Sequence, residues 1–188
     1  MQCTWPGNDE QMLHYHDHEW GTPVHDDLKH FEFLLLDCFQ AGLSWKTILH
    51  RRKNFKKAFA NFNYKKIAQF NDDDVKRLMN DAGIIRNKLK ITGTIKNAKA
   101  FIEVQKEFGS FDAFIWQFTE HKQIVTKVKT PAEIRATSPE SDAMSKALKK
   151  RGFTFVGSTI CYAYMQAAGM INDHLVSCKR YKEVQIKK

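Results

Sequence analysis

The sequence predicts an all-α protein. Apolar residues in the interior of the 188-residue chain recur at spacings of three and four, which is the pattern of one buried helix face. Asp, Asn or Ser stands before several of these stretches and Gly follows some of them, as at helix starts and ends. Alternation of apolar and polar residues with hairpin turns is scarce. A chain of this length, 43% hydrophobic, fits a single domain over residues 1–188.

Six helices are expected from start signals and apolar patterns. Asp26–Asp27 and Asn71–Asp73 supply N-cap residues, and Ser138–Pro139 adds a proline at a first helical position. Gly109 is expected to end the longest helix, and Ser110 to begin the next. In chain order the helices cover about residues 26–38, 71–83, 87–108, 110–118, 138–152 and 157–168. Residues 1–26 and 121–136 are expected to be extended loops.

The chain is basic, with 30 Lys and Arg against 21 Asp and Glu, a net charge of +9 and a pI near 9.4. This balance suits a polyanionic partner, with nucleic acid as the first candidate. Basic residues gather at 46–57, at 146–151 and at 179–188, and the last of these segments is expected to be a flexible tail. No apolar run approaches the ~20 residues that span a bilayer, and no secretory signal opens the chain. We therefore expect a cytosolic protein with no membrane partner.

Four cysteines in a cytosolic chain favour metal binding or free thiols over disulfides. Cys38 and Cys161 lie within apolar helical patterns and are expected to be small buried residues. Cys3 and Cys178 differ, because each has a histidine at ligand spacing.

Twelve residues separate Cys3 from His16, and three separate His174 from Cys178. Two thiolates and two imidazoles make a closed ligand set for structural zinc, which would join the N-terminal arm to the C-terminal segment. His14 and His18 would point to the same side of an extended chain as His16, so spacing leaves the choice among these three open. Accidental pairing of surface residues is the alternative to a metal site.

Residues 148–159 look like a helix-hairpin-helix element. Gly152 can adopt a positive φ and end the first helix, and Gly157 removes a side chain where the second begins. The backbone N–H groups of Gly157, Ser158 and Thr159 would then be free to bind a phosphate group. Lys149, Lys150 and Arg151 add positive charge next to them. An ordinary helical hairpin with a solvated basic end is the alternative.

Several motifs resemble the 3-methyladenine DNA glycosylase I family of the helix-hairpin-helix glycosylase superfamily. They occur in the family's order and cover roughly residues 3–178. The motifs are YHDHEWG at 15–21, QAGLSW at 40–45, AGIIR at 82–86, SKALKKRGF at 145–153, FVGSTICY at 155–162, and NDH at 172–174 followed by Cys178. As a set they are highly specific.

The resemblance implies a helix-hairpin-helix DNA glycosylase fold with one structural zinc ion. It implies that this chain hydrolyses the N-glycosidic bond of 3-methyladenine in alkylated double-stranded DNA, leaving an abasic site and cutting no strand. The ligands it implies are Cys3, His16, His174 and Cys178. The base pocket it implies contains Trp5, Tyr15 and Trp45, and the DNA contacts are Gly42, Leu43, Lys150, Gly152, Gly157, Ser158 and Thr159.

Asp37 is the informative departure from the family pattern. Family members usually carry Glu at this position, where the carboxylate accepts hydrogen bonds from the bound base, so Asp37 is the candidate catalytic residue with a shorter reach. A non-catalytic or altered-specificity protein that binds alkylated DNA is therefore an alternative function. A zinc-joined helical domain that contacts another protein is a third. Nothing in the sequence signals an oligomer, and a monomer is the default.

Overall fold

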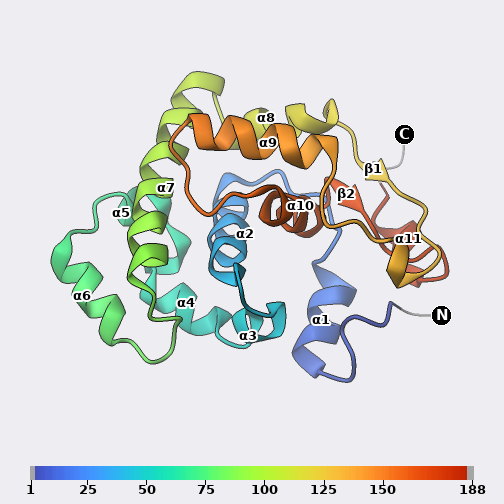
Figure 1. Cartoon of the computed structure of the whole chain (residues 1–188), viewed down its shortest axis with the longest axis horizontal. Helices are drawn as coiled ribbons and strands as arrows, with labels where there is room; N and C mark the ends of the chain where they lie inside the picture. The colour runs from blue at the N-terminus through green and yellow to red at the C-terminus, as the bar shows by residue number, and fades with distance from the viewer. Residues whose placement is uncertain (1–2, 186–188) are drawn as a thin grey trace.

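The computed structural model describes residues 3–185, and in this part of the chain the protein is almost entirely helical (Figure 1). Two very short strands pair in parallel, Ile124 with Ile171 and Val125 with Asn172. The longer helices are α1 (Glu10–His18), α2 (Asp27–Gln40), α6 (Asp72–Asn80), α7 (Lys88–Phe108), α9 (Pro139–Lys150) and α10 (Ser158–Ala167). The short elements are α3 (Trp45–Leu49), α4 (Arg52–Ala58), η1 (Ala60–Phe62), α5 (Tyr64–Ile67), α8 (Phe111–Trp116), η2 (Gln117–Thr119), β1 (Ile124–Val125), η3 (Pro131–Glu133), β2 (Ile171–Asn172) and α11 (Lys179–Glu183).

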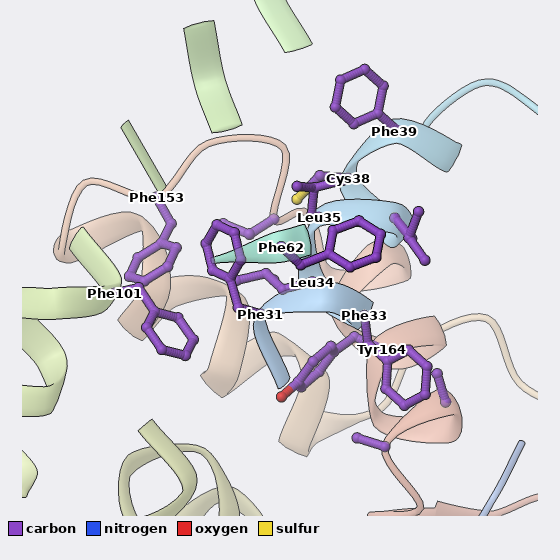
Figure 2. Close-up of a cluster of buried hydrophobic side chains, with 14 of the residues drawn as sticks. Phe31, Phe33, Leu34, Leu35, Cys38, Phe39, Phe62, Phe101, Phe153 and Tyr164 are labelled. Atoms are coloured by element: carbon purple, nitrogen blue, oxygen red, sulfur yellow. The ribbon is translucent and has the colours of Figure 1, made fainter. Parts of the chain in front are cut away.

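Helix α2 forms the centre of the hydrophobic core. It packs against α7, α8 and α10, and its side chains are buried on nearly every face from His30 to Phe39. Figure 2 shows Phe31, Phe33 and Phe39 leaving this helix in different directions. The Phe31 ring packs edge-on to Phe101, and the Phe39 ring packs edge-on to Phe55. A helix that is apolar all round must be enclosed by others, and α2 is. The residues near its C-terminal end therefore have a fixed position in the molecule.

The predicted helices are confirmed, with starts at the expected caps. The side chains of Asp26, Asn71, Asn87, Ser110 and Ser138 each accept a hydrogen bond from a backbone N–H in the following first turn. Each cap satisfies a donor that the helix itself leaves free. Gly109 ends α7 with a φ of +84°, which glycine adopts without strain.

The loop prediction for residues 1–26 is wrong over α1. Asp9 caps this helix by accepting from Met12 N, and the buried side chains are Met12, Tyr15 and His16. The segment is largely polar, so its apolar face is narrow and gives little helical signal in the sequence. Helices α3, α4 and α5, and the β1 and η3 elements within residues 121–136, were not predicted.

The C-terminal segment is ordered further than expected. Residues 179–183 form α11 instead of starting a flexible tail, and Val184 is buried behind it. Arg180 donates to the Thr22 hydroxyl, which ties this helix to the segment after α1. The rest of the predicted tail, residues 186–188, lies outside the described residues. No helix in the part that is described is long and apolar enough to cross a membrane.

Hydrogen bonds from a side chain of α7 hold the hairpin between α9 and α10 in place. Asn97 of α7 accepts from Thr154 N at 2.8 Å and donates to Thr154 O at 3.0 Å, so its side chain pairs with the turn as another strand would. Ser145 donates to Val156 O. Gly152 has a φ of +86°, as its predicted role in ending the first helix requires.

Candidate active site and metal centre

A cavity of about 230 Å³ opens where α1, α2, α3 and α10 meet. This volume is below the roughly 300–1,000 Å³ of pockets for drug-sized ligands, as expected for a site that takes one small ring system. The residues that line it are Trp5, Tyr15, Trp20, Asp37, Gln40, Trp45, Ile134, Ala163, Gln166 and Ala167. The structure thus brings together Trp5, Tyr15, Asp37 and Trp45, the four residues that the sequence singled out for the base site.

Asp37 supplies an unpaired carboxyl group to this cavity. Its side chain is 2% exposed, and its Oδ2 atom has no hydrogen-bond partner among the described residues. Burial raises the pKa of Asp37 well above its ordinary value. A buried polar atom without a partner is costly, and such atoms gather at functional sites. The carboxyl group is therefore placed to interact with a ligand.

Aromatic rings enclose the rest of the cavity. The rings of Tyr15 and Trp45 have centroids 5.1 Å apart, and Trp5 lies edge-on to Tyr15 at 6.3 Å and to Trp20 at 5.0 Å. The indole N–H groups of Trp5 and Trp45 are buried and unpaired among the described residues. Such an enclosure offers π-faces to a cationic ring and a few unpaired polar groups to orient it.

Trp20 and Gln166 belong to the lining but were not predicted as pocket residues. Trp20 lies within the same YHDHEWG motif as Tyr15, and that motif is the signal that could have found it. Gln166 follows Ala163 by three positions on α10, so the two share a helix face, but nothing in the sequence marks that face as lining a pocket.

Gly42 and Leu43 form an exposed turn directly after α2. Gly42 has a φ of +76°, and Leu43 is 41% exposed, which is unusual for a large apolar side chain. The carbonyl groups of Phe39 and Ala41, just before the turn, accept hydrogen bonds from the buried Lys90 ammonium at 2.8 and 2.6 Å. Leu43 is thus exposed to solvent on a turn whose position is fixed, just after the helix that carries Asp37.

The hairpin presents an open helix start. Gly157 is the N-cap of α10 and has no side chain to bond the first turn. The first helical hydrogen bond runs from Cys161 N to Gly157 O, so the N–H groups of Ser158 and Thr159 have no acceptor within the helix. Lys150 is exposed at the end of α9. Helix α10 connects the two sites, because its first turn belongs to the hairpin and its later turns line the cavity.

Cys3, His16 and Cys178 form a cluster that could bind a metal ion. Their ligand atoms all lie within 4.8 Å of one another, and all three side chains are buried. Cys178 Sγ lies 3.7 Å from His16 Nε2, near the separation of about 3.5 Å that tetrahedral zinc imposes on sulfur and nitrogen ligands. Burial raises the pKa of the Cys3 thiol to about 11, so a cation binding there would displace a proton.

His174 lies against this cluster, although the 4.8 Å group of described residues does not include it. Its ring centroid is 5.0 Å from that of His16, and its Nε2 atom is buried without a partner. Its Nδ1 lies 3.1 Å from Asn172 Oδ1, and His16 Nδ1 lies 2.7 Å from Asp17 Oδ1. Oxygen acceptors at Nδ1 favour the tautomer whose Nε2 lone pair is free for a metal. Burial, with the nearby charge of His16, lowers the pKa of His174 to about 3, which keeps it neutral.

Helix α1 decides between the three neighbouring histidines. His14 and His18 lie one turn apart on the outer face, with stacked rings 4.3 Å apart, while His16 points inward and is fully buried. An extended chain would have placed all three on one side. His16 and His174 also support the cavity wall, since the Trp5 ring packs on His16 at 5.6 Å and the Trp20 ring packs on His174 at 4.6 Å.

This arrangement is the fold of the helix-hairpin-helix DNA glycosylases. The family model described as methyladenine glycosylase matches residues 5–181. The chain is 47% identical to DNA-3-methyladenine glycosylase 1 of Escherichia coli (strain K12) over 96% of both chains. This protein belongs to the methyladenine glycosylase family.

Solved structures agree with this assignment. A crystal structure of 3-methyladenine DNA glycosylase I superposes with a TM-score of 0.93 at 43% identity, covering 95% of this chain and 98% of that one. A variant of 3-methyladenine DNA glycosylase I in complex with 3-methyladenine superposes with a TM-score of 0.92 at 30% identity, covering 95% and 96%.

Proposed function

We propose that this protein is a DNA-3-methyladenine glycosylase I that removes 3-methyladenine from alkylated double-stranded DNA. The observation that carries the proposal is the unpaired carboxyl group of Asp37 within a cage of aromatic rings. Family membership and the names of the relatives supply the identity of the base. We also propose that the whole chain, residues 1–188, acts as one monomeric domain.

The reaction breaks the bond between the sugar carbon C1′ and the base nitrogen N9. The bonding electrons go to the base, which neutralises the positive charge that methylation placed on its ring. Water supplies a hydroxyl group to C1′ and releases a proton, so the products are an abasic sugar and a neutral free base. The cationic base is already a good leaving group. The protein therefore needs to supply less acid catalysis than it would for release of a neutral base.

The residues of the cavity would favour the extruded, cationic base. Tyr15 and Trp45 offer π-faces, an interaction worth about 0.5–2 kcal/mol depending on how far the charge is desolvated. Asp37 would accept a hydrogen bond from the base. The positive charge of the bound base would lower the raised pKa of the Asp37 carboxyl group. Extruding a damaged base costs a few kcal/mol. Leu43 would fill the gap left in the duplex, with Gly42 allowing the turn.

The hairpin would hold the duplex without reading its sequence. The N–H groups of Gly157, Ser158 and Thr159 would bind a phosphate group, with Lys150 and the turn at Gly152 beside them. Such contacts make DNA affinity fall with rising salt concentration. A salt-independent affinity would instead favour a protein-binding role.

One zinc ion, held by Cys3, His16, His174 and Cys178, completes the proposal. Two thiolates and two imidazoles would make a closed ligand set, so the ion would have a structural role. It would fasten the N-terminal segment that carries Trp5 to the C-terminal segment.

The test is release of free base from a methylated duplex, with separation of the DNA strands afterwards. We expect free 3-methyladenine, an intact strand before heat or alkali, and a break at the abasic site after them. Strand cleavage without such treatment would contradict the monofunctional mechanism. Duplex binding without release would favour the non-catalytic alternative, and comparing Asp37→Glu with Asp37→Asn tests whether the shorter acid limits the reaction.

A further inference from the structure

Gln166 is a polar cavity residue to which the proposed mechanism gives no role. It lines the same cavity as Asp37, from the opposite helix α10. Its side-chain amide can either donate through nitrogen or accept through oxygen, so its effect on a base depends on which end faces the cavity. The contacts of the amide decide this question.

Asp173 fixes the orientation of that amide. Gln166 Nε2 donates to Asp173 Oδ2 at 2.7 Å, so the NH₂ group is the end of the amide that faces Asp173. Asp173 is 1% exposed and is itself held by the hydroxyl groups of Tyr162 at 2.8 Å and Thr126 at 2.6 Å. These contacts leave the amide little freedom to turn over.

The amide oxygen of Gln166 is then the end available to a ligand. None of the described residues donates a side-chain or backbone hydrogen bond to this oxygen, and it is not among the buried unpaired atoms, so it is accessible. The cavity is therefore lined from two sides by residues whose side-chain oxygens can accept hydrogen bonds from a cationic base, Asp37 and Gln166. Two acceptors suit a donor group, such as an exocyclic amine, and repel an exocyclic carbonyl oxygen.

We infer that Gln166, oriented by Asp173, is a specificity-determining residue that selects bases with an amino group at C6 over bases with an oxygen there. This inference rests on the proposed function. Its consequence is discrimination between 3-methyladenine, which has a 6-amino group, and 3-methylguanine, which has a 6-oxo group. Asp173 is a positioning residue that acts through Gln166.

The test measures both free bases released from one methylated duplex by each variant. Gln166→Met keeps the length of the side chain and removes the acceptor, so release of 3-methyladenine should fall roughly 10- to 100-fold, the effect of one hydrogen bond to a charged group. Release of 3-methylguanine should fall less or rise. Gln69→Met, on an exposed residue outside the cavity, is the matched control and should leave both unchanged.

Asp173→Asn gives a sharper result, because an amide at 173 can donate to Gln166 Oε1 and let its NH₂ group turn into the cavity. The ratio of 3-methyladenine to 3-methylguanine released should then fall by at least the factor seen for Gln166→Met. A purely structural role would lower both rates and leave the ratio unchanged, and that outcome would overturn the inference. If the wild-type protein releases neither base, the proposed function itself fails.

Discussion

The ammonium group of Lys90 lies 2.8 Å from the carbonyl oxygen of Phe39, deep in the junction between α7 and the end of α2. A second bond, to Ala41 O at 2.6 Å, caps the next free carbonyl. Lys90 is 7% exposed, and its ammonium group donates both of these hydrogen bonds to backbone carbonyl groups. A buried cation at a helix C-terminus stabilises the helix through its dipole and its orphan carbonyls. It also fixes the turn that presents Leu43.

Lys90→Met should lower the free energy of unfolding by about 1–3 kcal/mol, because two buried carbonyl groups lose a charged donor. Urea denaturation measures this change, with Lys88→Met as the exposed neighbour on the same helix turn. Equal effects of the two substitutions would show that the capping bonds contribute nothing.

Asp37 should cost the protein stability at neutral pH. Burial raises the pKa of Asp37 in the folded state well above its ordinary value of 3.8, so the folded state holds a proton that the unfolded chain has released. Stability contributed by this group is therefore complete below pH 3.8 and is lost as the pH rises toward the folded-state pKa. Asp37→Asn should accordingly be more stable than wild type at pH 7, with the gap closing in acid.

The measurement is thermal unfolding of both proteins from pH 3.5 to pH 8. The same variant should release 3-methyladenine more slowly, the trade between stability and activity expected of a strained site. A constant difference in stability at all pH values would mean that the carboxyl group keeps its ordinary pKa.

Local signals explain why most helices were predictable. Asp26, Asn71 and Ser138 each bond a backbone N–H two or three residues along the chain, so the information for the helix start lies in a few neighbouring residues. Helix α1 was not predicted from the sequence. Its apolar face consists of Met12, Tyr15 and His16, and these are held by contacts with α3 and with the C-terminal segment.

The cavity was only partly predictable for a related reason. Tyr15 and Trp45 lie in motifs that resemble a known family, and Asp37 stands three residues before one of them, where the family usually carries Glu. Gln166 faces the same cavity from a helix more than a hundred residues away, and its orientation depends on Asp173 and Thr126. Neither the contact nor the direction of the amide has a local signal in the sequence.

Removal of one metal ligand should unfasten the two ends of the chain. Cys178→Ala should abolish stoichiometric zinc and lower the free energy of unfolding by more than about 4 kcal/mol, since loss of a metal site is among the few single changes of that size. Cys161→Ala, at a buried cysteine outside the cluster, should keep the metal. Elemental analysis and chemical denaturation check both.

The same substitution should also reach the cavity, because Trp5 packs on His16. Affinity for free 3-methyladenine, followed by tryptophan fluorescence, should therefore weaken in Cys178→Ala. Full zinc content in this variant would contradict the proposed ligand set.

Leu43 should matter for DNA and not for the free base. Leu43→Ala removes the side chain that would fill the gap in the duplex, so release of 3-methyladenine from DNA should slow while affinity for the free base stays unchanged. Leu28 is the matched control, since it is 44% exposed against 41% for Leu43 and lies at the opposite end of α2. Parallel effects of the two alanine variants would exclude a specific role for Leu43.

The two glycines of the hairpin should respond differently to alanine. Gly157 has a φ of −64°, and no heavy atom lies within 4 Å of the position a Cβ would take, so Gly157→Ala fits the fold without strain. The added methyl group would stand at the open start of α10, where the phosphate group is proposed to bind. DNA affinity should fall about tenfold, the effect of one lost charge-assisted hydrogen bond, with the melting temperature unchanged.

Gly152→Ala should instead lower the stability of the fold. Its φ of +86° is strained for any residue with a Cβ, so the free energy of unfolding should fall by about 1–2 kcal/mol. Because Lys96 at 3.9 Å is the nearest heavy-atom contact, this loss comes from the backbone and not from a clash. Binding to a short duplex containing an abasic site, measured beside thermal unfolding, separates the two effects. If Gly157→Ala bound that duplex as tightly as wild type, the phosphate site would have to lie elsewhere than at the start of α10.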